Sequence, residues 1–260
     1  MSSPWVERLE SEIEAFEKTL AGNLSKELKQ IKPSRLPVIL NHAAKNKQYD
    51  IYNSTTIEGY HITPEEVSAI ISGGKKTGTK SPEEIQNKMA IIGHAKAFDF
   101  VIKEIKKQFK RPQISEDLVL NIFAQLFEPS VEAKIINRFD LVGYRRIKVY
   151  IRHSQYVPPS FEKVPDLMHC FANRINKIDH NLIKAILAHY FLVTIHTFFD
   201  GNGRCARLLM NFMLTASGYH WLTIPAVKRD EYFSALQKGQ IEENILPFAK
   251  FILKSQREAE

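Results

Sequence analysis

Apolar residues recur at intervals of three and four along most of this 260-residue chain, and that spacing gathers them on one face of an α-helix. The pattern predicts helices over residues 7–20, 40–57, 82–109, 115–127, 164–178, 181–195, 202–216 and 244–253. Thr63-Pro64-Glu65-Glu66 and Ser81-Pro82-Glu83-Glu84 each supply the hydroxyl, proline and glutamate that begin a helix. Between them, residues 72–80 are rich in glycine, lysine and threonine and are expected to form a mobile surface loop. We therefore expect a mainly α-helical fold.

One region, residues 143–157, departs from the helical spacing. Its apolar and polar residues alternate in the order Ile147, Lys148, Val149, Tyr150, Ile151 and Arg152, and two prolines follow at 158 and 159. Alternation with a period of two is typical of a β-strand that has one exposed face. We therefore expect a small β-hairpin flap, and a hairpin that only shields the core is one interpretation of it.

The composition is that of a folded, water-soluble protein, with 44% hydrophobic and 25% charged residues. The net charge of +7 fits either a surface that binds nucleic acid or a basic face in solvent. Lysines crowd residues 103–111, where Phe109 is the only aromatic residue that could stack on a base. The solvated face is therefore favoured, and nucleic acid is not the expected partner.

The cysteine count, the first 21 residues and the longest apolar segments together bear on where the protein resides. Two cysteines, Cys170 and Cys205, are too few for a disulfide framework and fit a reducing compartment. The first 21 residues mix charged with apolar side chains and resemble no signal peptide. No segment approaches the ~20 apolar residues that a membrane-spanning helix requires. We expect a cytoplasmic protein that does not enter the membrane.

The segment with the most chemical information is residues 196–207, His-Thr-Phe-Phe-Asp-Gly-Asn-Gly-Arg-Cys-Ala-Arg, between two predicted helices. Gly201 and Gly203 permit backbone conformations that turn successive amides toward one point, and the following helix adds its own free amides. Such an arrangement binds phosphate groups. Taken singly, these residues are also typical of a tight turn, but the twelve together favour a phosphate site.

The charged residues of this segment suit a reaction on a polyphosphate. Arg204 and Arg207 lie three apart on one helix face, where a multiply charged anion would relieve their repulsion. Asp200 is a hard oxygen ligand, and Mg²⁺ bound to phosphates takes only one or two protein carboxylates. His196 ends an apolar helix and has a side chain that can accept a proton near neutral pH.

At every specified position the segment resembles the signature of the Fic family, His-x-Phe-x-(Asp/Glu)-Gly-Asn-Gly-Arg-x-x-Arg, with Thr197 where proline is common. The resemblance implies a Fic-type helical bundle that transfers AMP from Mg-ATP to a hydroxyl of another protein. His196 would be the general base and Asp200 would hold Mg²⁺. The phosphates would be bound by Gly201, Asn202, Gly203, Arg204 and Arg207.

Two further features bear on the nucleotide. Members of the related Doc branch, which phosphorylate their targets, tend to have lysine at the position of Gly203, so glycine here favours AMP transfer. Tyr232, Phe233 and Gln240 resemble the family segment that lines the adenine pocket, although Phe233 and Gln240 are substitutions. The alternative interpretation of these three residues is an ordinary amphipathic helix with two core aromatics.

An inhibitory element is predicted at residues 54–59, Ser-Thr-Thr-Ile-Glu-Gly, which resemble the family motif (Ser/Thr)-x-x-x-Glu-(Gly/Asn). The carboxylate of Glu58 would pair with Arg207 and displace the γ-phosphate of ATP. Ser54 and Gly59 complete the motif. Glu58-Gly59 is also what an ordinary helix end looks like, because glycine commonly follows the last helical residue.

The resulting hypothesis is an auto-inhibited protein adenylyltransferase with an N-terminal helical region at 1–81 and a Fic catalytic domain at 82–260. Its target protein is unknown and would dock on the flap at 143–157, and related proteins often form homodimers. One alternative keeps the site and removes AMP from a target or uses another nucleotide. A second alternative, of another class, is a catalytically silent module that binds nucleotide or nucleic acid.

Overall fold

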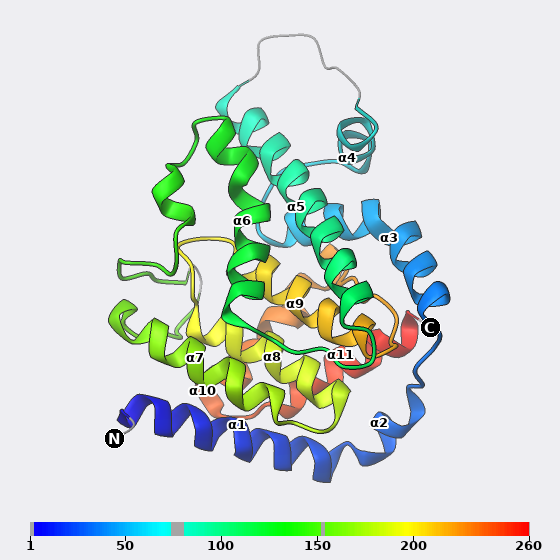
Figure 1. The fold of residues 1–260 in the computed structure, drawn as a ribbon, viewed down its shortest axis with the longest axis vertical. Helices are drawn as coiled ribbons and strands as arrows, with labels where there is room; N and C mark the ends of the chain where they lie inside the picture. Colours follow the sequence, from blue (N-terminus) through cyan, green and yellow to red (C-terminus); the bar gives the residue numbers. More distant parts are fainter. Residues whose placement is uncertain (1–2, 74–80, 152–153, 260) are drawn as a thin grey trace.

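The computed structural model describes residues 3–73, 81–151 and 154–259, so part of the predicted loop at 72–80 lies outside the described residues. Its α-helices are α1 (Pro4–Asn23), α2 (Ser25–Gln30), α3 (Leu36–Ile57), α4 (Pro64–Ile71), α5 (Pro82–Lys107), α6 (Glu116–Glu132), α7 (Val164–Asn176), α8 (Asn181–Ile195), α9 (Asn202–Ala216), α10 (Arg229–Glu242) and α11 (Leu246–Glu258). Short 3-10 helices occur at Arg138–Leu141, Phe161–Lys163 and Ala226–Lys228. The prediction of a mainly helical fold is confirmed (Figure 1).

Both hydroxyl caps read from the sequence are present. The Thr63 side chain accepts a hydrogen bond from the amide of Glu66, and the Ser81 side chain accepts one from the amide of Glu84. In both caps the glutamate carboxylate accepts a hydrogen bond from the cap amide in return. These reciprocal bonds satisfy amides that would otherwise be free, which is why α4 and α5 begin at the prolines.

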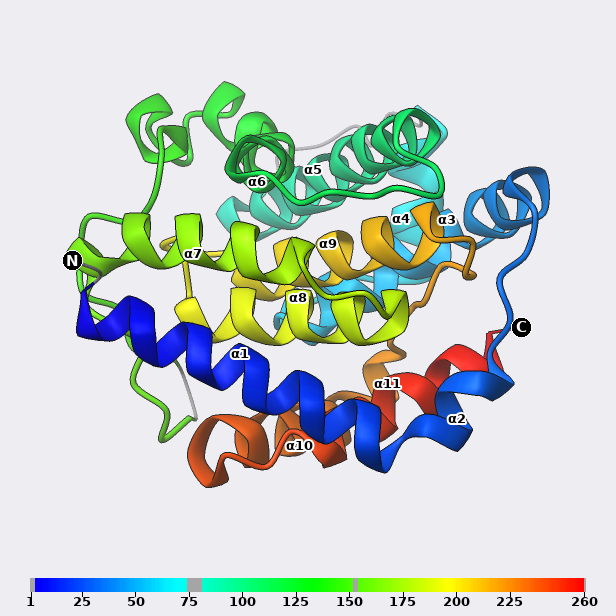
Figure 2. The same ribbon diagram turned by 60° about the horizontal axis from the view of Figure 1, so that its bottom comes forward.

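Helices α8 and α9 form the centre of the molecule. Nearly all of their side chains are buried, which is typical of helices surrounded by others on every side. In Figure 2, α5 and α6 cover one side of this pair, and α1, α10 and α11 lie on the opposite side. The turn between α8 and α9 carries residues 196–201, so the predicted phosphate loop is held by the two most buried helices of the fold.

Helix α1 packs directly on α7 and α8. Its buried side chains are Leu9, Ile13, Phe16 and Leu20. The ring of Phe16 contacts those of Tyr190 and Phe191 on α8, with centroids 5.5 and 5.9 Å apart. Residues of the 1–81 range thus share one hydrophobic core with α7 and α8, and the division into two domains at residue 81 stays a prediction.

The predicted β-hairpin flap is not seen. The residues of 143–157 that the structure describes, which exclude 152 and 153, form turns and irregular backbone and no strand. Ile147 and Tyr150 are 61% and 70% exposed, so the alternating side chains have no surface to cover. The guanidinium of Arg145 donates hydrogen bonds to the carbonyls of Ile147 and Pro159, one on each arm of the segment. A side chain therefore joins the two arms where a hairpin would use backbone ladder bonds.

The described residues also show the state of the two cysteines and the suitability of the helices for crossing a membrane. Cys170 and Cys205 are both buried free thiols. None of the described helices has the combination of length and hydropathy needed to cross a lipid bilayer.

Candidate active site

The turn between α8 and α9 has two residues in the left-handed backbone region. His196 ends α8 with φ 54°, and Gly201 precedes α9 with φ 75°. The side-chain amide of Asn202 closes the loop, since its Oδ1 accepts from the Phe198 amide and its Nδ2 donates to the Phe198 carbonyl, both at 2.8 Å. The ring of Phe198 stacks on Phe123 at 3.9 Å and anchors the turn in the core. The side chain of Asn202 thus shapes the loop, and its backbone remains available for a phosphate.

The two glycines are required by their surroundings. A Cβ at Gly201 would lie 2.5 Å from the ring of Phe127, and the positive φ would strain any other residue. A Cβ at Gly203 would overlap the Oε1 of Glu58. The first amides of α9 have no acceptor within the helix. The start of α9 therefore has the donors and the dipole direction that favour an anion.

The imidazole of His196 is held as a neutral base. Its Nδ1 lies 3.3 Å from the carbonyl of Val193, and because a carbonyl can only accept, Nδ1 carries the proton in this contact. Burial lowers the pKa of His196 to about 4. The ring is therefore neutral at pH 7, with Nε2 as the nitrogen that can accept a proton.

The two arginines of α9 are almost completely buried and have different partners. Arg204 lies between the rings of Tyr60 and Phe127, with its guanidinium carbon 5.0 and 4.9 Å from their centroids. Its Nη2 donates to the Tyr60 hydroxyl at 3.3 Å. The Nε of Arg204 and the Nη1 of Arg207 are buried and have no hydrogen-bond partner. Both arginines thus keep an N–H donor free for a further acceptor.

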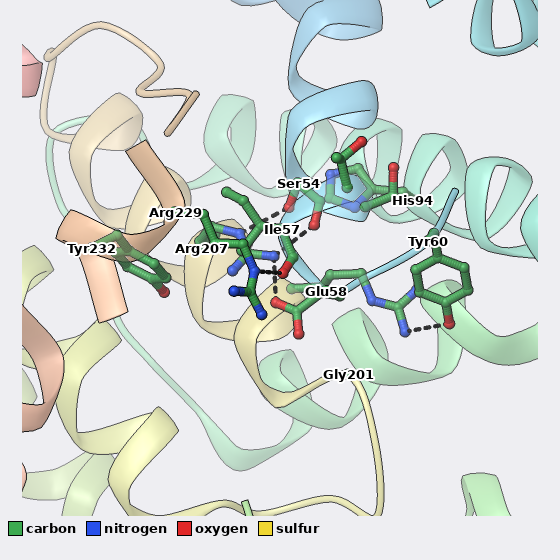
Figure 3. A network of polar contacts seen from close by, with 12 residues as sticks. Ser54, Ile57, Glu58, Tyr60, His94, Gly201, Arg207, Arg229 and Tyr232 are labelled. Atoms are coloured by element: carbon green, nitrogen blue, oxygen red, sulfur yellow. Dashed lines mark hydrogen bonds and ion pairs between the residues drawn. The ribbon is translucent and has the colours of Figure 1, made fainter. Parts of the chain in front are cut away.

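Arg207 is bound by the end of α3. Its Nε donates to the Ser54 hydroxyl at 2.9 Å, and its Nη2 donates to the Ser54 carbonyl at 2.8 Å and to Oε1 of Glu58 at 2.7 Å. Gly59 follows with φ 93° and turns the chain away from the helix. Figure 3 shows Glu58 between Arg207 and Tyr60, beside the turn at Gly201. The three residues of the predicted inhibitory motif therefore lie at the α9 arginines.

Asp200 is the only predicted metal ligand and lies at the open side of the turn. Its carboxylate accepts from the Gly201 amide at 2.6 Å and lies 3.7 Å from Nη2 of Arg204. The side chain is 55% exposed. Within the described residues no group of three or more His, Cys, Asp or Glu side chains could hold a metal ion. A single carboxylate beside a phosphate site nevertheless fits Mg²⁺, which keeps most of its water ligands.

The three predicted adenine-pocket residues all lie on α10, where the rings of Tyr232 and Phe233 are in contact with centroids 5.1 Å apart. Tyr232 is fully buried, and its hydroxyl contacts Nε2 of His189 at 2.9 Å. The centroid of its ring lies 6.0 Å from the guanidinium carbon of Arg207, so Tyr232 is an aromatic neighbour of that arginine. Phe233 packs under Arg229, and Gln240 donates to the Thr194 hydroxyl on α8 at 3.3 Å. A role of these residues in binding adenine stays a prediction.

The sequence did not point to three residues near the site, Tyr60, Arg145 and Arg229. Tyr60 follows the inhibitory motif directly, and an aromatic residue two positions after Glu58 was the available signal. Arg229 donates to the carbonyl of Ile57 at 2.9 Å and so satisfies the end of α3. Arg145 donates to the backbone carbonyl of His196. It lies in the segment at 143–157, where the prediction used only the alternation of apolar and polar residues.

The fold and the site together define a helical protein with a glycine turn at the start of α9 and a neutral histidine beside it. Residues 113–214 match the Fic/DOC family model. The protein adenylyltransferase Fic of Drosophila grimshawi is 30% identical over 218 residues, which cover 80% of this chain and 41% of that protein. The corresponding protein of Drosophila mojavensis is 31% identical over 219 residues, covering 80% and 40%. The chain belongs to the Fic/DOC family.

Solved structures give the same fold. A Fic domain containing signaling protein from Bacteroides thetaiotaomicron aligns with a TM-score of 0.72 at 21% identity, covering 92% of each chain. Fic-1 from C. elegans aligns with a TM-score of 0.69 at 22% identity, covering 98% of this chain and 70% of that one. At such identities the similarity establishes the fold. The chain spans about two fifths of the length of the curated Drosophila relatives.

Proposed function

We propose that this protein is an auto-inhibited protein adenylyltransferase, which transfers AMP from Mg-ATP to a Ser, Thr or Tyr hydroxyl of a target protein. The observation that carries the proposal is the 2.7 Å contact between Glu58 and Arg207 beside a glycine turn and a neutral His196. The curated relatives are named protein adenylyltransferase Fic, which supports the same activity.

In this mechanism each residue of the turn has one task. Nε2 of His196 takes the proton from the target hydroxyl, whose oxygen forms a bond to the α-phosphorus of ATP. The bond between the α-phosphorus and the β-phosphate oxygen breaks, and pyrophosphate leaves. The amides at Gly201, Asn202 and Gly203, with Arg204, stabilise the negative charge that develops on the phosphate oxygens. Mg²⁺ held by Asp200 would neutralise part of that charge.

Inhibition follows from competition for Arg207. The carboxylate of Glu58 already binds the Nη2 that would otherwise hold the γ-phosphate of ATP. The overlap that a Cβ at Gly203 would make with Glu58 also places this carboxylate against the start of α9. A triphosphate bound without that arginine has its α-phosphorus out of line, and a misplacement of about 1 Å costs roughly 100-fold in rate.

The glutamate switch is tested with the Glu58→Gly variant, incubated with Mg²⁺ and each nucleoside triphosphate and followed by intact mass. We expect an added AMP mass with ATP at a rate roughly 100-fold above the parent chain. The matched control is Glu58→Gly combined with His196→Ala, which should add no mass because the base is gone. An unchanged or lower rate in Glu58→Gly would contradict the inhibitory role.

The same variant separates transfer from the removal of AMP by hydrolysis. If the chain removes AMP from a modified target, Glu58 orients the attacking water, so its loss should abolish hydrolysis while transfer rises. The nucleotide series also reveals whether a donor other than ATP is used. Binding of DNA that falls steeply with salt, without any labelling by ATP, would instead favour the silent binding module.

We also propose that the target binds along residues 143–157, although without a preformed strand. Ile147, Tyr150 and Val157 are 61%, 70% and 57% exposed, which leaves apolar side chains available to a partner. An extended target segment could add to this irregular backbone and become ordered with it. Homodimer formation and a cytoplasmic location stay predictions.

A further inference from the structure

Arg145 is a buried arginine whose hydrogen-bond acceptors are all backbone carbonyls. Its side chain is 5% exposed. Its Nε donates to the His196 carbonyl at 2.7 Å, its Nη1 donates to the Ile147 carbonyl at 3.1 Å, and its Nη2 donates to the Pro159 carbonyl. Its own amide donates to the Thr197 carbonyl at 3.0 Å. One residue therefore joins three separate stretches of backbone.

On the catalytic side, Arg145 holds the peptide that follows the proposed base. His196 has φ 54° and ψ 59°, a left-handed conformation that is unfavourable for a residue with a side chain. Such a conformation persists only where the surroundings fix it. The two carbonyls that Arg145 binds, those of His196 and Thr197, are the first ones after α8. Arg145 thus fixes the backbone from which the imidazole projects.

On the opposite side, Arg145 holds both arms of the segment at 147–157. The carbonyl of Ile147 begins this segment and that of Pro159 follows it, so the planar guanidinium closes the segment at its base. The donors of one rigid group set the distance between this segment and the His196 peptide. A lysine could not reproduce that geometry, because its ammonium is a single point donor.

We propose that Arg145 is a positioning residue for the transfer step, which sets the distance between the docking residues 147–151 and 154–157 of this chain and the Nε2 of His196. The inference rests on the proposed function for its kinetic consequence. The structural consequence of the inference does not depend on the proposed function. Without Arg145, the backbone around residues 145 and 159 and the backbone at 196–201 are no longer held by the same side chain. Arg145 contacts the carbonyls of His196 and Thr197 and none of the phosphate donors of α9, so we expect the KM for ATP to change far less than kcat.

The kinetic test uses Arg145→Met and Arg145→Lys in the Glu58→Gly background. Arg145→Met should lower kcat for AMP transfer roughly 100-fold, the usual cost of a misplaced reacting group, and leave KM for ATP within about twofold. Arg145→Lys should recover part of the loss, because it keeps the charge and at least one hydrogen bond. Arg111→Met, which removes an exposed arginine on the loop before α6, is the matched control and should change neither constant.

A second measurement, hydrogen exchange of the same variants, does not depend on activity. Arg145→Lys should raise the exchange rates of amides in both 145–159 and 196–201 and leave those of α5 unchanged. Unchanged exchange at 196–201, or an unaltered kcat in a folded Arg145→Met protein, would overturn the inference. A rise in KM for ATP that matches the loss in kcat would also overturn it. If the Glu58→Gly parent adds no AMP, the proposed function fails, and the exchange result still decides the role of Arg145.

Discussion

Glu58 and Tyr60, which are separated by one glycine, contact the two buried arginines of α9. Glu58 binds Arg207, and Tyr60 covers Arg204 with its ring and hydroxyl. The positive φ of Gly59 lets the chain turn between them. The end of α3 thus engages both guanidinium groups that the proposed reaction assigns to phosphates.

For Tyr60, we predict that substitution by alanine raises the rate of AMP transfer. In Tyr60→Ala, Arg204 loses a hydrogen bond and an aromatic neighbour that compete with the nucleotide. A rise of about fivefold is expected, which corresponds to about 1 kcal/mol for one such contact. Tyr60→Phe, which keeps the ring, should give a smaller rise. The measurement is the initial rate of AMP incorporation, and a rate equal to the parent in both variants would show that Tyr60 does not restrain Arg204.

The lowered pKa of His196 predicts how the rate of AMP transfer depends on pH. Burial lowers the pKa of His196 to about 4, and the negative charge of Glu58 raises it, so removing Glu58 lowers it further. The folded enzyme therefore keeps a neutral base well below the ordinary histidine pKa of 6.5. In Glu58→Gly, the rate of transfer should stay level from pH 8 to about 5.5 and fall only at lower pH. A rate that halves near pH 6.5 would contradict this assignment.

At the scale of the element, helix α9 depends on the backbone at its start. We predict that Gly201→Ala lowers the free energy of unfolding by about 1–3 kcal/mol, because the new methyl group meets Phe127 and φ is 75°. Gly22→Ala is a matched control in α1, where a Cβ would meet nothing within 4 Å. It should stabilise the protein by about 0.5–1 kcal/mol, since alanine is the better helix former. Urea unfolding measures both.

Helix α3 is tied to the core by a buried polar cluster and by an exposed ion pair. Asp50, which is 4% exposed, contacts Nε2 of His94 on α5 at 3.1 Å and accepts from the Thr223 hydroxyl at 2.8 Å. Lys47 pairs with Asp99 on the surface of α5 at 2.6 Å. Burial lowers the pKa of His94, so its ring is neutral at pH 7 and donates to the carboxylate. The contact between Asp50 and His94 is thus removed from solvent, with side chains 6% and 0% exposed.

Two aspartate variants compare these contacts. We predict that Asp50→Ala lowers the free energy of unfolding by about 2–4 kcal/mol, because the buried imidazole of His94 and the half-buried hydroxyl of Thr223 both lose this acceptor. Asp99→Ala breaks the exposed pair between the same helices and should cost less than about 1 kcal/mol. Equal losses in urea unfolding would show that the cluster around Asp50 does not fasten α3.

At the scale of the whole molecule, the shared core predicts one cooperative unfolding transition. The chain has two tryptophans, and they report on different parts: Trp5 lies on α1 and Trp221 lies buried against Phe98 of α5. In a Trp221→Phe variant, the fluorescence of Trp5 should change at the same urea concentration as the helical circular dichroism. An earlier change at Trp5 would mean that the N-terminal region unfolds separately, as a domain boundary at residue 81 would allow.

Much of the architecture could be predicted because helix formation is governed by local spacing. Apolar residues at three- and four-residue intervals predicted α8 and α9, and the caps at Thr63 and Ser81 located two helix starts. The flap was predicted wrongly from the same kind of pattern. Alternation shows which side chains share a face, but a strand also needs a partner strand, and Arg145 binds the carbonyls on its two arms instead.

The sequence alone determined the chemical groups of the candidate site, because residues 196–207 are contiguous and one turn presents them together. The pairing of Glu58 with Arg207, 149 positions away, was already expected from the resemblance of residues 54–59 to the inhibitory motif. Only the tertiary structure revealed that Tyr60 contacts Arg204, 144 positions away, and that Arg145 contacts the His196 carbonyl, 51 positions away. These contacts depend on how α3, α9 and the segment at 143–157 pack on one core, which no local pattern encodes. The aromatic partner of Arg204 and the restraint on the His196 backbone are therefore properties of the fold.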